Sequence, residues 1–304
     1  MATVETKLAA EHPVRVTNLG KLLWPEAGIT KADYIQYVID MAPCLIRHLQ
    51  DRPLTVVRFP HGIHADSFYQ KNAPKDTPEW VQTFAVYSKE SKRDIHYILA
   101  NNTATLIWLA NQACIELHPW YSKIQNPDSP TNIAIDLDPT VPDFEKVRKV
   151  AFCIKEILDN LRFPSYPKTS GATGLQIFIP LRSGFTFRET RVITEFIARY
   201  MANRYPDLVT IERLVKDRGD KVYVDYLQHA PGKTLVGAYS PRPVPDATVS
   251  APVTWEELVQ GAVPEDFTIR TMPERVKKVG DLFAPMEQEG IDITHILHLI
   301  RNHP

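Results

Sequence analysis

Three stretches of the chain alternate apolar with polar side chains, which is the pattern of a β-strand that buries one face. They are TNIAIDLDP at residues 131–139, LQIFIPL at 175–181 and KVYVDYL at 221–227. Two of the three carry aspartates, although a carboxylate within an apolar strand is costly unless a partner offsets its charge. The chain must therefore build a sheet around acidic side chains, and this limits both its fold and its chemistry.

Helical patterns separate these predicted strands. Residues 30–49 place apolar side chains on one broad face behind a threonine that can cap the helix, and Pro43 is expected to kink or divide it. Residues 142–161 form the clearest amphipathic helix, a third runs from about Glu189 to Arg204, and a fourth begins at the capping box Thr254–Glu257. Strands separated by helices without regular βαβ spacing predict a mixed α+β fold.

Bulk composition limits where such a chain works. Hydrophobic residues are 44% and charged residues 23% of the 304 positions, which predicts a globular chain. The three cysteines are widely spaced without a CxxC pair, and no apolar run reaches the ~18 residues that span a bilayer. We therefore expect a cytoplasmic protein with no membrane partner, made of one domain over 1–304 with a flexible N-terminal tail at 1–13.

The acidic side chains are candidates for metal binding. Asp136 and Asp138 are two residues apart in a strand, so both project from one face, where they repel each other unless a cation lies between them. Mg²⁺ or Mn²⁺ suits such oxygen ligands. The alternative is that the two aspartates only mark the end of a strand, which turns at Pro139. Asp225 is either a third ligand or a partner in a structural salt bridge. Three carboxylates on neighbouring strands match a two-metal phosphoryl- or nucleotidyl-transfer site.

A compact turn lies between the two acidic strands, within KTSGATGLQIF at 168–178. Its Ser170, Gly171, Thr173 and Gly174 form a turn whose backbone N–H groups can hold phosphate oxygens. The spacing is neither that of a Walker loop nor that of a dinucleotide fingerprint. An ordinary hairpin turn would explain the segment alone, but its place between two acidic strands predicts a seat for a triphosphate.

The order of these motifs is similar to that of a known family. IDLDP, TSGATGLQIF, KVYVDYLQHAPGKT and AYSPRP resemble the polymerase domain of bacterial DNA ligase D, in the archaeo-eukaryotic primase superfamily, which serves non-homologous end joining. Further matches are TNLGKLLWPEAGITKADYIQYV at 17–38, RFPHGIHADSFYQKNAP at 58–74 and NQACIELHPW at 111–120. The resemblance covers nearly the whole chain and implies a primase-like α+β fold, with a mixed or antiparallel, RRM-like sheet flanked by helices.

The resemblance also implies a role for each matched residue. Asp136, Asp138 and Asp225 match the family's metal-binding and catalytic triad. In the family, this triad holds two Mn²⁺ or Mg²⁺ ions and aligns a primer 3′-OH with the α-phosphate of the incoming nucleotide. The nucleotide-binding positions are His118, Ser170, Gly171, Thr173, Gly174, Gln176, Gln228 and Arg242. The DNA-binding positions are Asn18, Lys21 and Lys31 for a downstream 5′-phosphate, and Phe68 and Tyr69 for stacking on the bases, with Arg58 nearby.

Two positions depart from the family pattern. The family's loop motif usually reads SGxxGxH, and here the last position is Gln176, which keeps a donor but cannot carry a positive charge. Alternation with Leu175 and Ile177 turns Gln176 toward the acidic face. Thr173 stands where some members have lysine. The loss of these charges predicts weaker nucleotide binding or an altered metal preference.

The resemblance implies a template-dependent nucleotidyltransferase that extends primers and fills gaps at DNA breaks, with a ribonucleotide preference. The expected partners are NTP or dNTP, DNA ends or gapped duplex with a 5′-phosphate, a Ku-type end-binding protein and a separate DNA ligase, in the nucleoid-associated cytoplasm. One alternative is a primase that starts chains de novo, against which the 5′-phosphate pocket argues. The other is a non-catalytic end-synapsis module, favoured if Gln176 marks decayed chemistry.

The net charge of -1 hides unlike regions. Residues 1–160 carry a net charge of -2, residues 161–242 of +6, and residues 243–304 of -5. The total taken alone argues against a strongly cationic nucleic-acid binder, but binding depends on local potential. We therefore expect selective contact with a DNA end or gap, with marked salt sensitivity.

Overall fold

A computed structural model describes residues 12–288 and 290–302, which form two compact units. Among these residues, the first unit contains 12–120, 235–250 and 265–280, and the second contains 121–234, 251–264 and 281–302. The predicted single catalytic domain over 1–304 stays a prediction, and most of the predicted tail lies outside the described residues. No helix in the described ranges is long and apolar enough to cross a bilayer.

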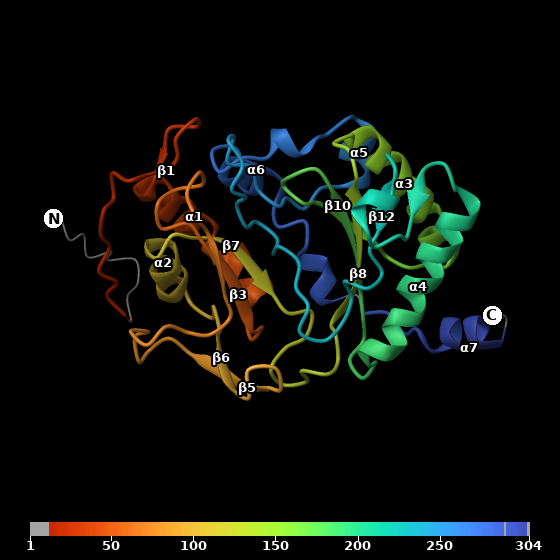
Figure 1. The fold of residues 1–304 in the computed structure, drawn as a ribbon, viewed down its shortest axis with the longest axis horizontal. Helices are drawn as coiled ribbons and strands as arrows, with labels where there is room; N and C mark the ends of the chain where they lie inside the picture. The colour runs from red at the N-terminus through yellow and green to blue at the C-terminus, as the bar shows by residue number, and fades with distance from the viewer. Residues whose placement is uncertain (1–11, 289, 303–304) are drawn as a thin grey trace. The chain divides into compact units, whose positions relative to one another are not determined.

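The first unit joins helices to an antiparallel sheet (Figure 1). Its strands are β3 (Leu54–Arg58), β4 (Phe68–Gln70), β5 (Thr83–Ser88), β6 (Arg93–Ile98) and β7 (Cys114–Pro119), and β3 pairs with β4, β6 and β7. A separate ladder joins β1 (Leu22–Trp24) to β2 (Ile29–Thr30). The helices are α1 (Lys31–Leu49), α2 (Thr103–Asn111) and α6 (Met272–Val279).

Helix α1 confirms the predicted helix at 30–49, including the threonine cap. The Thr30 side chain accepts from the Asp33 backbone N–H, and the Asp33 carboxylate accepts from the Thr30 backbone N–H. Of the two effects predicted for Pro43, division of the helix is wrong, because α1 is continuous through that residue, while a kink stays a prediction. Pro43 lies on the exposed side of α1, while Met41, Cys44 and their neighbours are buried, so packing of the buried side holds the helix together.

The second unit is built on a mixed five-stranded sheet in the order β11-β12-β8-β10-β9. These strands are β8 (Asn132–Pro139), β9 (Tyr166–Thr169), β10 (Leu175–Pro180), β11 (Val209–Thr210) and β12 (Val222–Val224). Only β11 and β12 pair in parallel. The predicted strands at 131–139 and 175–181 are confirmed, and the mixed α+β class is confirmed with them.

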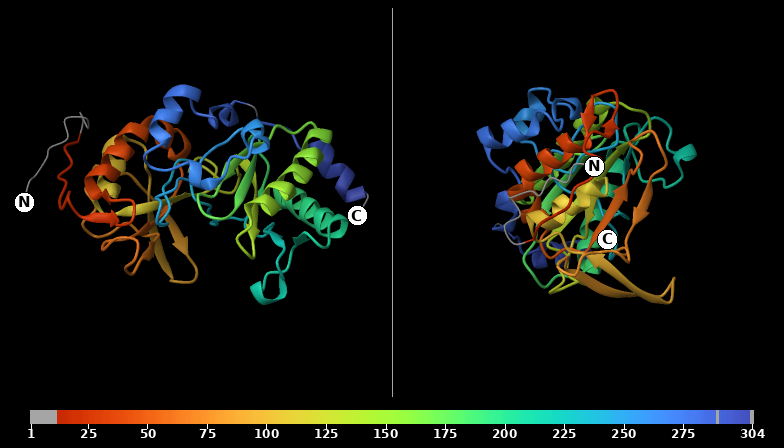
Figure 2. Two further views of the ribbon diagram at one scale, coloured as in Figure 1. Left: turned by 90° about the horizontal axis from the view of Figure 1, so that it is seen from above. Right: turned by 90° about the vertical axis from the view of Figure 1, so that its left-hand side faces the viewer.

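Helices α3 (Phe144–Asn160) and α4 (Phe187–Arg204) cover one face of this sheet (Figure 1; Figure 2, left). The buried side chains between helices and sheet are Ile133, Ile135, Leu137, Leu175, Ile177, Ile179, Val147, Val150, Ile154, Leu158, Ile193, Ile197 and Met201. Both helices confirm the predicted amphipathic segments, and α5 (Trp255–Val259) starts at the predicted capping box. Helix α7 (Thr294–Asn302) and three short 3₁₀ turns, Val215–Asp217, Pro264–Asp266 and Ala284–Glu287, complete the described elements.

The predicted strand at 221–227 is only partly right. Strand β12 ends at Val224, so Asp225 follows the strand instead of lying inside it. The backbone N–H groups of Leu227 and Gln228 both donate to Asp225 Oδ1, at 3.0 and 3.1 Å. An aspartate that captures the N–H groups of the next residues replaces ladder hydrogen bonds with a turn.

Candidate nucleotidyl-transfer site

The face of the second unit's sheet opposite α3 and α4 carries the acidic residues. Asp136 pairs in register with Gln176 of β10, which pairs in turn with Lys168 of β9, while Asp138 pairs with Tyr223 of β12. Directly paired residues share a face of the sheet, and residues two apart in a strand do so too. All five side chains therefore project from this face. The strand register thus agrees with the prediction that Asp136 and Asp138 lie on the same side of the sheet.

Asp225 is held next to the first aspartate by the backbone. Its N–H group donates to the Asp136 carbonyl oxygen at 3.0 Å. Its carboxylate Oδ1 accepts from the Tyr223 hydroxyl at 3.0 Å, in addition to the two backbone N–H groups of the following turn. The turn after β12 therefore fixes the orientation of Asp225 beside β8.

The carboxylates of Asp136, Asp138 and Asp225 crowd negative charge on this face of the sheet. Asp136 is only 7% exposed, and burial, followed by the charge of Asp138, raises the pKa of its carboxyl well above the ordinary value. A hydrogen bond from Gln176 opposes this, the charge of Asp225 adds to it, and Lys168 partly offsets it. The three carboxylates therefore repel one another, which is the condition that a bound cation relieves.

The donor set of this face fits a hard divalent cation. Asp136, Asp138 and Asp225 offer carboxylate oxygens, which Mg²⁺ and Mn²⁺ prefer to nitrogen or sulfur. Within residues 12–288 and 290–302, no three His, Cys, Asp or Glu side chains already converge closely enough to enclose a metal ion. The chemistry of the side chains thus fits the predicted metal.

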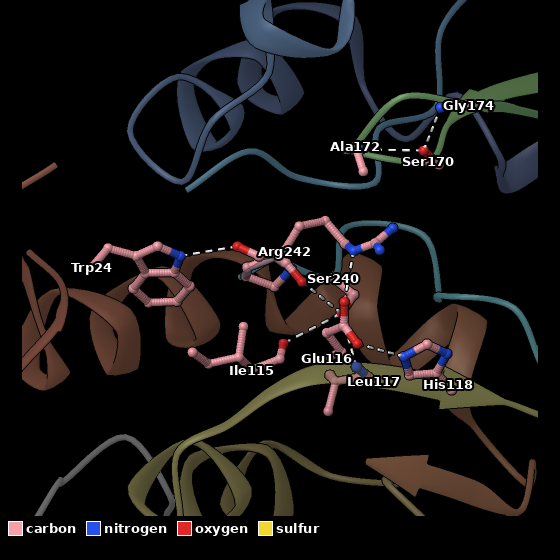
Figure 3. A network of polar contacts seen from close by, with 11 residues as sticks. Trp24, Ile115, Glu116, Leu117, His118, Ser170, Ala172, Gly174, Ser240 and Arg242 are labelled. Carbon is pink, nitrogen blue, oxygen red and sulfur yellow. Dashed lines mark hydrogen bonds and ion pairs between the residues drawn. The ribbon is translucent and has the colours of Figure 1, made fainter. Parts of the chain in front are cut away.

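The glycine loop, residues 170–174, joins β9 to β10 beside the three aspartates. Gly174 lies so close to β8 that a Cβ atom there would be 2.5 Å from the Leu137 carbonyl oxygen and 3.2 Å from Asp138 Oδ1. Ser170 Oγ accepts from the N–H groups of Ala172 and Gly174, at 3.2 and 3.0 Å (Figure 3). These two N–H groups brace the loop itself, while Thr173 at its tip is exposed.

Two predicted nucleotide-binding glutamines have structural partners. Gln176 Nε2 donates to Asp136 Oδ1 at 3.1 Å, which agrees with the expectation that Gln176 faces the acids. Gln228 Nε2 donates to the Thr234 carbonyl oxygen at 2.6 Å and so braces the turn behind Asp225. Lys168 was missed by the sequence analysis, yet its ammonium donates to Gln176 Oε1 at 2.5 Å and its side chain is buried.

In the first unit, a buried glutamate joins two predicted nucleotide-binding residues. Glu116 Oε1 accepts from Arg242 Nε at 2.7 Å, and Glu116 Oε2 accepts from His118 Nε2 at 3.1 Å (Figure 3). Burial opposes ionisation, but the hydrogen bond from His118 and the charge of Arg242 outweigh it and lower the pKa of the Glu116 carboxyl. The Arg242 carbonyl oxygen also accepts from Trp24 Nε1 at 2.9 Å. Glu116 was not predicted as a functional residue.

The predicted base-stacking residues lie on β3 and β4 of the first unit. Phe68 and Tyr69 are 45% and 64% exposed, which is unusual for aromatic side chains and leaves their rings open to solvent. The Arg58 guanidinium lies 5.2 Å from the centre of the Phe68 ring and donates to Gln112 and Gln70. Arg58 therefore supports the Phe68 ring from its own strand, β3.

The predicted 5′-phosphate residues gather at the start of α1. Lys31 is buried and its ammonium donates to the Thr17 carbonyl oxygen at 2.8 Å, while Lys21 Nζ donates to the Pro60 carbonyl oxygen at 2.6 Å. Burial, together with the charge of Lys21, lowers the pKa of Lys31 to about 8. Asn18 adopts a positive φ of 53°, and its carbonyl oxygen accepts from the Lys21 N–H, which closes the turn. The two lysines thus form a local concentration of positive charge.

The predicted residues fall into two sets. The second unit contains the three aspartates, the glycine loop, Gln176 and Gln228. The first unit contains His118, Arg242, the aromatic pair Phe68 and Tyr69 with Arg58, and the lysine cluster of Lys21 and Lys31. Three aspartates beside a glycine loop are side chains of the kind that a two-metal transfer site requires. The fold and this site define a protein of the nucleotidyltransferase class.

Comparison with known proteins identifies the family. Residues 30–283 match the family described as "LigD, primase-polymerase domain", so the chain belongs to the LigD primase-polymerase domain family. This confirms the predicted family and enzyme class.

Related proteins agree with this assignment. The chain is 40% identical to the bifunctional non-homologous end joining protein LigD of Bacillus subtilis over 95% of its length, and 31% identical to the multifunctional LigD of Mycolicibacterium smegmatis over 92%. These alignments cover 47% and 38% of the relatives, so the chain spans about half their length or less.

A solved structure supports the same fold. The polymerase domain of Mycobacterium tuberculosis ligase D, in complex with DNA, matches with a TM-score of 0.84 and 28% identity. The match covers 91% of this chain and 99% of that domain. The predicted α+β primase-like fold is confirmed.

Proposed function

We propose that the chain is a template-dependent nucleotidyltransferase that extends primers and fills gaps at DNA double-strand breaks during non-homologous end joining. The observation that carries the proposal is the crowding of Asp136, Asp138 and Asp225 on one side of the sheet, beside the glycine loop. Family membership supports it, as do the names of the relatives, which are end-joining proteins, and the DNA bound to the mycobacterial domain.

Each part of the second unit has a proposed task. Asp136, Asp138 and Asp225 would hold two Mn²⁺ or Mg²⁺ ions, which when bound lower the pKa of a primer 3′-OH and neutralise charge on the triphosphate. The loop from Ser170 to Gly174 would receive the triphosphate, because Gly174 brings its backbone against β8 beside Asp138. The Asp225 turn, braced by Gln228, keeps its carboxylate directed beside β8.

The first unit supplies proposed contacts of other kinds. His118 and Arg242 are proposed nucleotide contacts, held in orientation by the buried Glu116 carboxylate. Phe68 and Tyr69 would stack on DNA bases, for which exposed aromatic rings are suited. The lysine cluster at the start of α1, with Asn18, would bind the 5′-phosphate downstream of a gap.

The finer features of this proposal concern substrates and partners. We propose a preference for ribonucleotides over deoxyribonucleotides, a Ku-type end-binding protein as a partner, and a DNA ligase activity that seals the filled gap. The setting would be the nucleoid. The net charge of +6 over residues 161–242 supports contact with nucleic acid in this part of the chain.

Primer extension tests this function. The substrate is a gapped duplex with a downstream 5′-phosphate, supplied with NTPs or dNTPs and with Mn²⁺ or Mg²⁺. The expected result is template-directed addition, faster with NTPs, and no addition by Asp136→Ala. If the folded wild-type chain adds no nucleotide with any metal, the polymerase proposal fails and end synapsis takes its place. Initiation without a primer would instead favour a primase.

A further inference from the structure

A buried line of three polar side chains crosses the sheet behind the aspartates. It runs from Lys168 on β9 through Gln176 on β10 to Asp136 on β8, each paired in register with the next. The Lys168 ammonium lies 2.5 Å from Gln176 Oε1, and Gln176 Nε2 lies 3.1 Å from Asp136 Oδ1. The three side chains are 1%, 3% and 7% exposed, so water has little access to any of them.

The chemistry of the two ends fixes the orientation of the central amide. An ammonium group can only donate hydrogen bonds, and an ionised carboxylate can only accept them. The Gln176 amide has one acceptor end and one donor end, so only one of its two flips satisfies both neighbours. Lys168 therefore locks the amide with its NH₂ group toward Asp136, and the amide in turn holds one carboxylate oxygen.

A buried lysine at this position is costly for an ordinary core. Its ammonium lies 5.7 Å from the centre of the Phe178 ring. An apolar side chain of similar size would fill this buried place without the desolvation penalty of a charge. Across the sheet, the acids carry an excess of negative charge. Lys168 is placed where its charge and hydrogen bond reach Asp136 through a single intervening side chain.

We propose that Lys168 and Gln176 are positioning residues that fix the Asp136 carboxylate for cation binding. The proposal rests on the proposed function, in which Asp136 is a ligand. Gln176 holds Oδ1 by its donated hydrogen bond, and Lys168 sets the direction in which the amide donates. The glutamine is therefore an orienting group for a carboxylate ligand. Groups that hydrogen-bond to ligands in this way typically change metal affinity or activity by about 10- to 100-fold when removed.

The test separates orientation from charge and from folding. Gln176→Leu removes both ends of the amide at similar size, Gln176→His keeps one donor and one acceptor, and Lys168→Met removes the cation at similar length. Binding of Mn²⁺ alone is followed by isothermal titration calorimetry, nucleotide KM and kcat by primer extension, and folding by thermal unfolding. Lys155→Met is the control, because Lys155 in α3 also lies over an aromatic ring but pairs with Asp159 of its own helix, away from the three aspartates.

We expect Gln176→Leu and Lys168→Met to weaken Mn²⁺ binding by about 10- to 100-fold and to lower kcat more than they raise KM. Gln176→His should recover most of the affinity, and Lys155→Met should match wild type. The inference is overturned if both disruptive variants are folded and bind Mn²⁺ within twofold of wild type, or if either unfolds while Gln176→His also loses binding. A wild-type chain that neither binds Mn²⁺ nor extends primers would instead refute the proposed function itself.

Discussion

Gly174 offers a sharp test of how closely the glycine loop must approach the acids. The residue has no positive φ, so its backbone accepts any side chain, and only space forbids one. A Cβ atom on Gly174 would lie 2.5 Å from the Leu137 carbonyl oxygen and 3.2 Å from Asp138 Oδ1. Gly174→Ala therefore presses a methyl group against the strand that carries two of the aspartates.

The size of the effect follows from the distances. Ordinary contact begins at 3.4 Å, so the loop and β8 must separate by about 0.9 Å. Leu137 is paired with Leu175 in the adjoining ladder, which resists such a shift. Overpacking of this kind costs about 1–3 kcal/mol in the free energy of unfolding. A displacement near 1 Å at a reacting centre can cost about 100-fold in turnover.

Thermal unfolding and single-nucleotide gap filling measure the two effects separately. Gly20→Ala is the stability control, because Gly20 also lacks a positive φ and a Cβ there meets nothing within 4 Å. We expect Gly174→Ala to be folded but destabilised, with turnover reduced about 100-fold, and Gly20→Ala to keep wild-type stability or gain slightly. Wild-type stability together with wild-type turnover in Gly174→Ala would refute the close approach of loop and strand.

Three further outcomes follow from the charged residues. The pKa of Lys31 is about 8, so its ammonium loses its charge as the pH rises through that value. The preference for a 5′-phosphorylated over a 5′-hydroxyl gap should therefore decline between pH 6.5 and 9.5, as measured by fluorescence anisotropy. Lys31→Met should show no such decline. Asp136→Asn should abolish extension yet raise the melting temperature by about 2–4 °C, because it removes a buried repelled charge; a lower melting temperature would contradict the charge crowding. Glu116→Gln should raise the nucleotide KM by about 10-fold, since hydrogen bonds to charged groups contribute about 1.5–3 kcal/mol, and an unchanged KM would show that Arg242 and His118 need no such support.

Local patterns sufficed for the parts of the fold that depend on near neighbours. The alternation in 131–139 and 175–181 predicted β8 and β10 because every second side chain in each strand packs against α3 and α4. The pattern failed at Asp225, where the carboxylate captures N–H groups of its own turn, and alternation cannot distinguish that turn from two more strand residues. At Pro43, burial of one side of α1 outweighs a local break that sequence rules expect.

The residues that the sequence analysis missed depend on distant partners. Glu116 and Arg242 are 126 positions apart, so nothing near either residue marks their ion pair. Lys168 reads as an ordinary lysine before a loop, and only the register of β9 with β10 buries it beside Gln176. The three aspartates were predictable because each follows or interrupts an apolar run, which is an unusual place for a carboxylate.

Single-turnover gap filling with Asp225→Asn tests the central claim most directly. The change keeps the shape of the side chain and its place after β12 but removes one of the three negative charges. Asp220→Asn is the control, because Asp220 lies in the same unit, is exposed and pairs with Lys146. We expect Asp225→Asn to lose nucleotide addition with Mn²⁺ or Mg²⁺ while it stays folded, and Asp220→Asn to extend primers as wild type does. Addition by Asp225→Asn at the wild-type rate would contradict a transfer site built on the three aspartates.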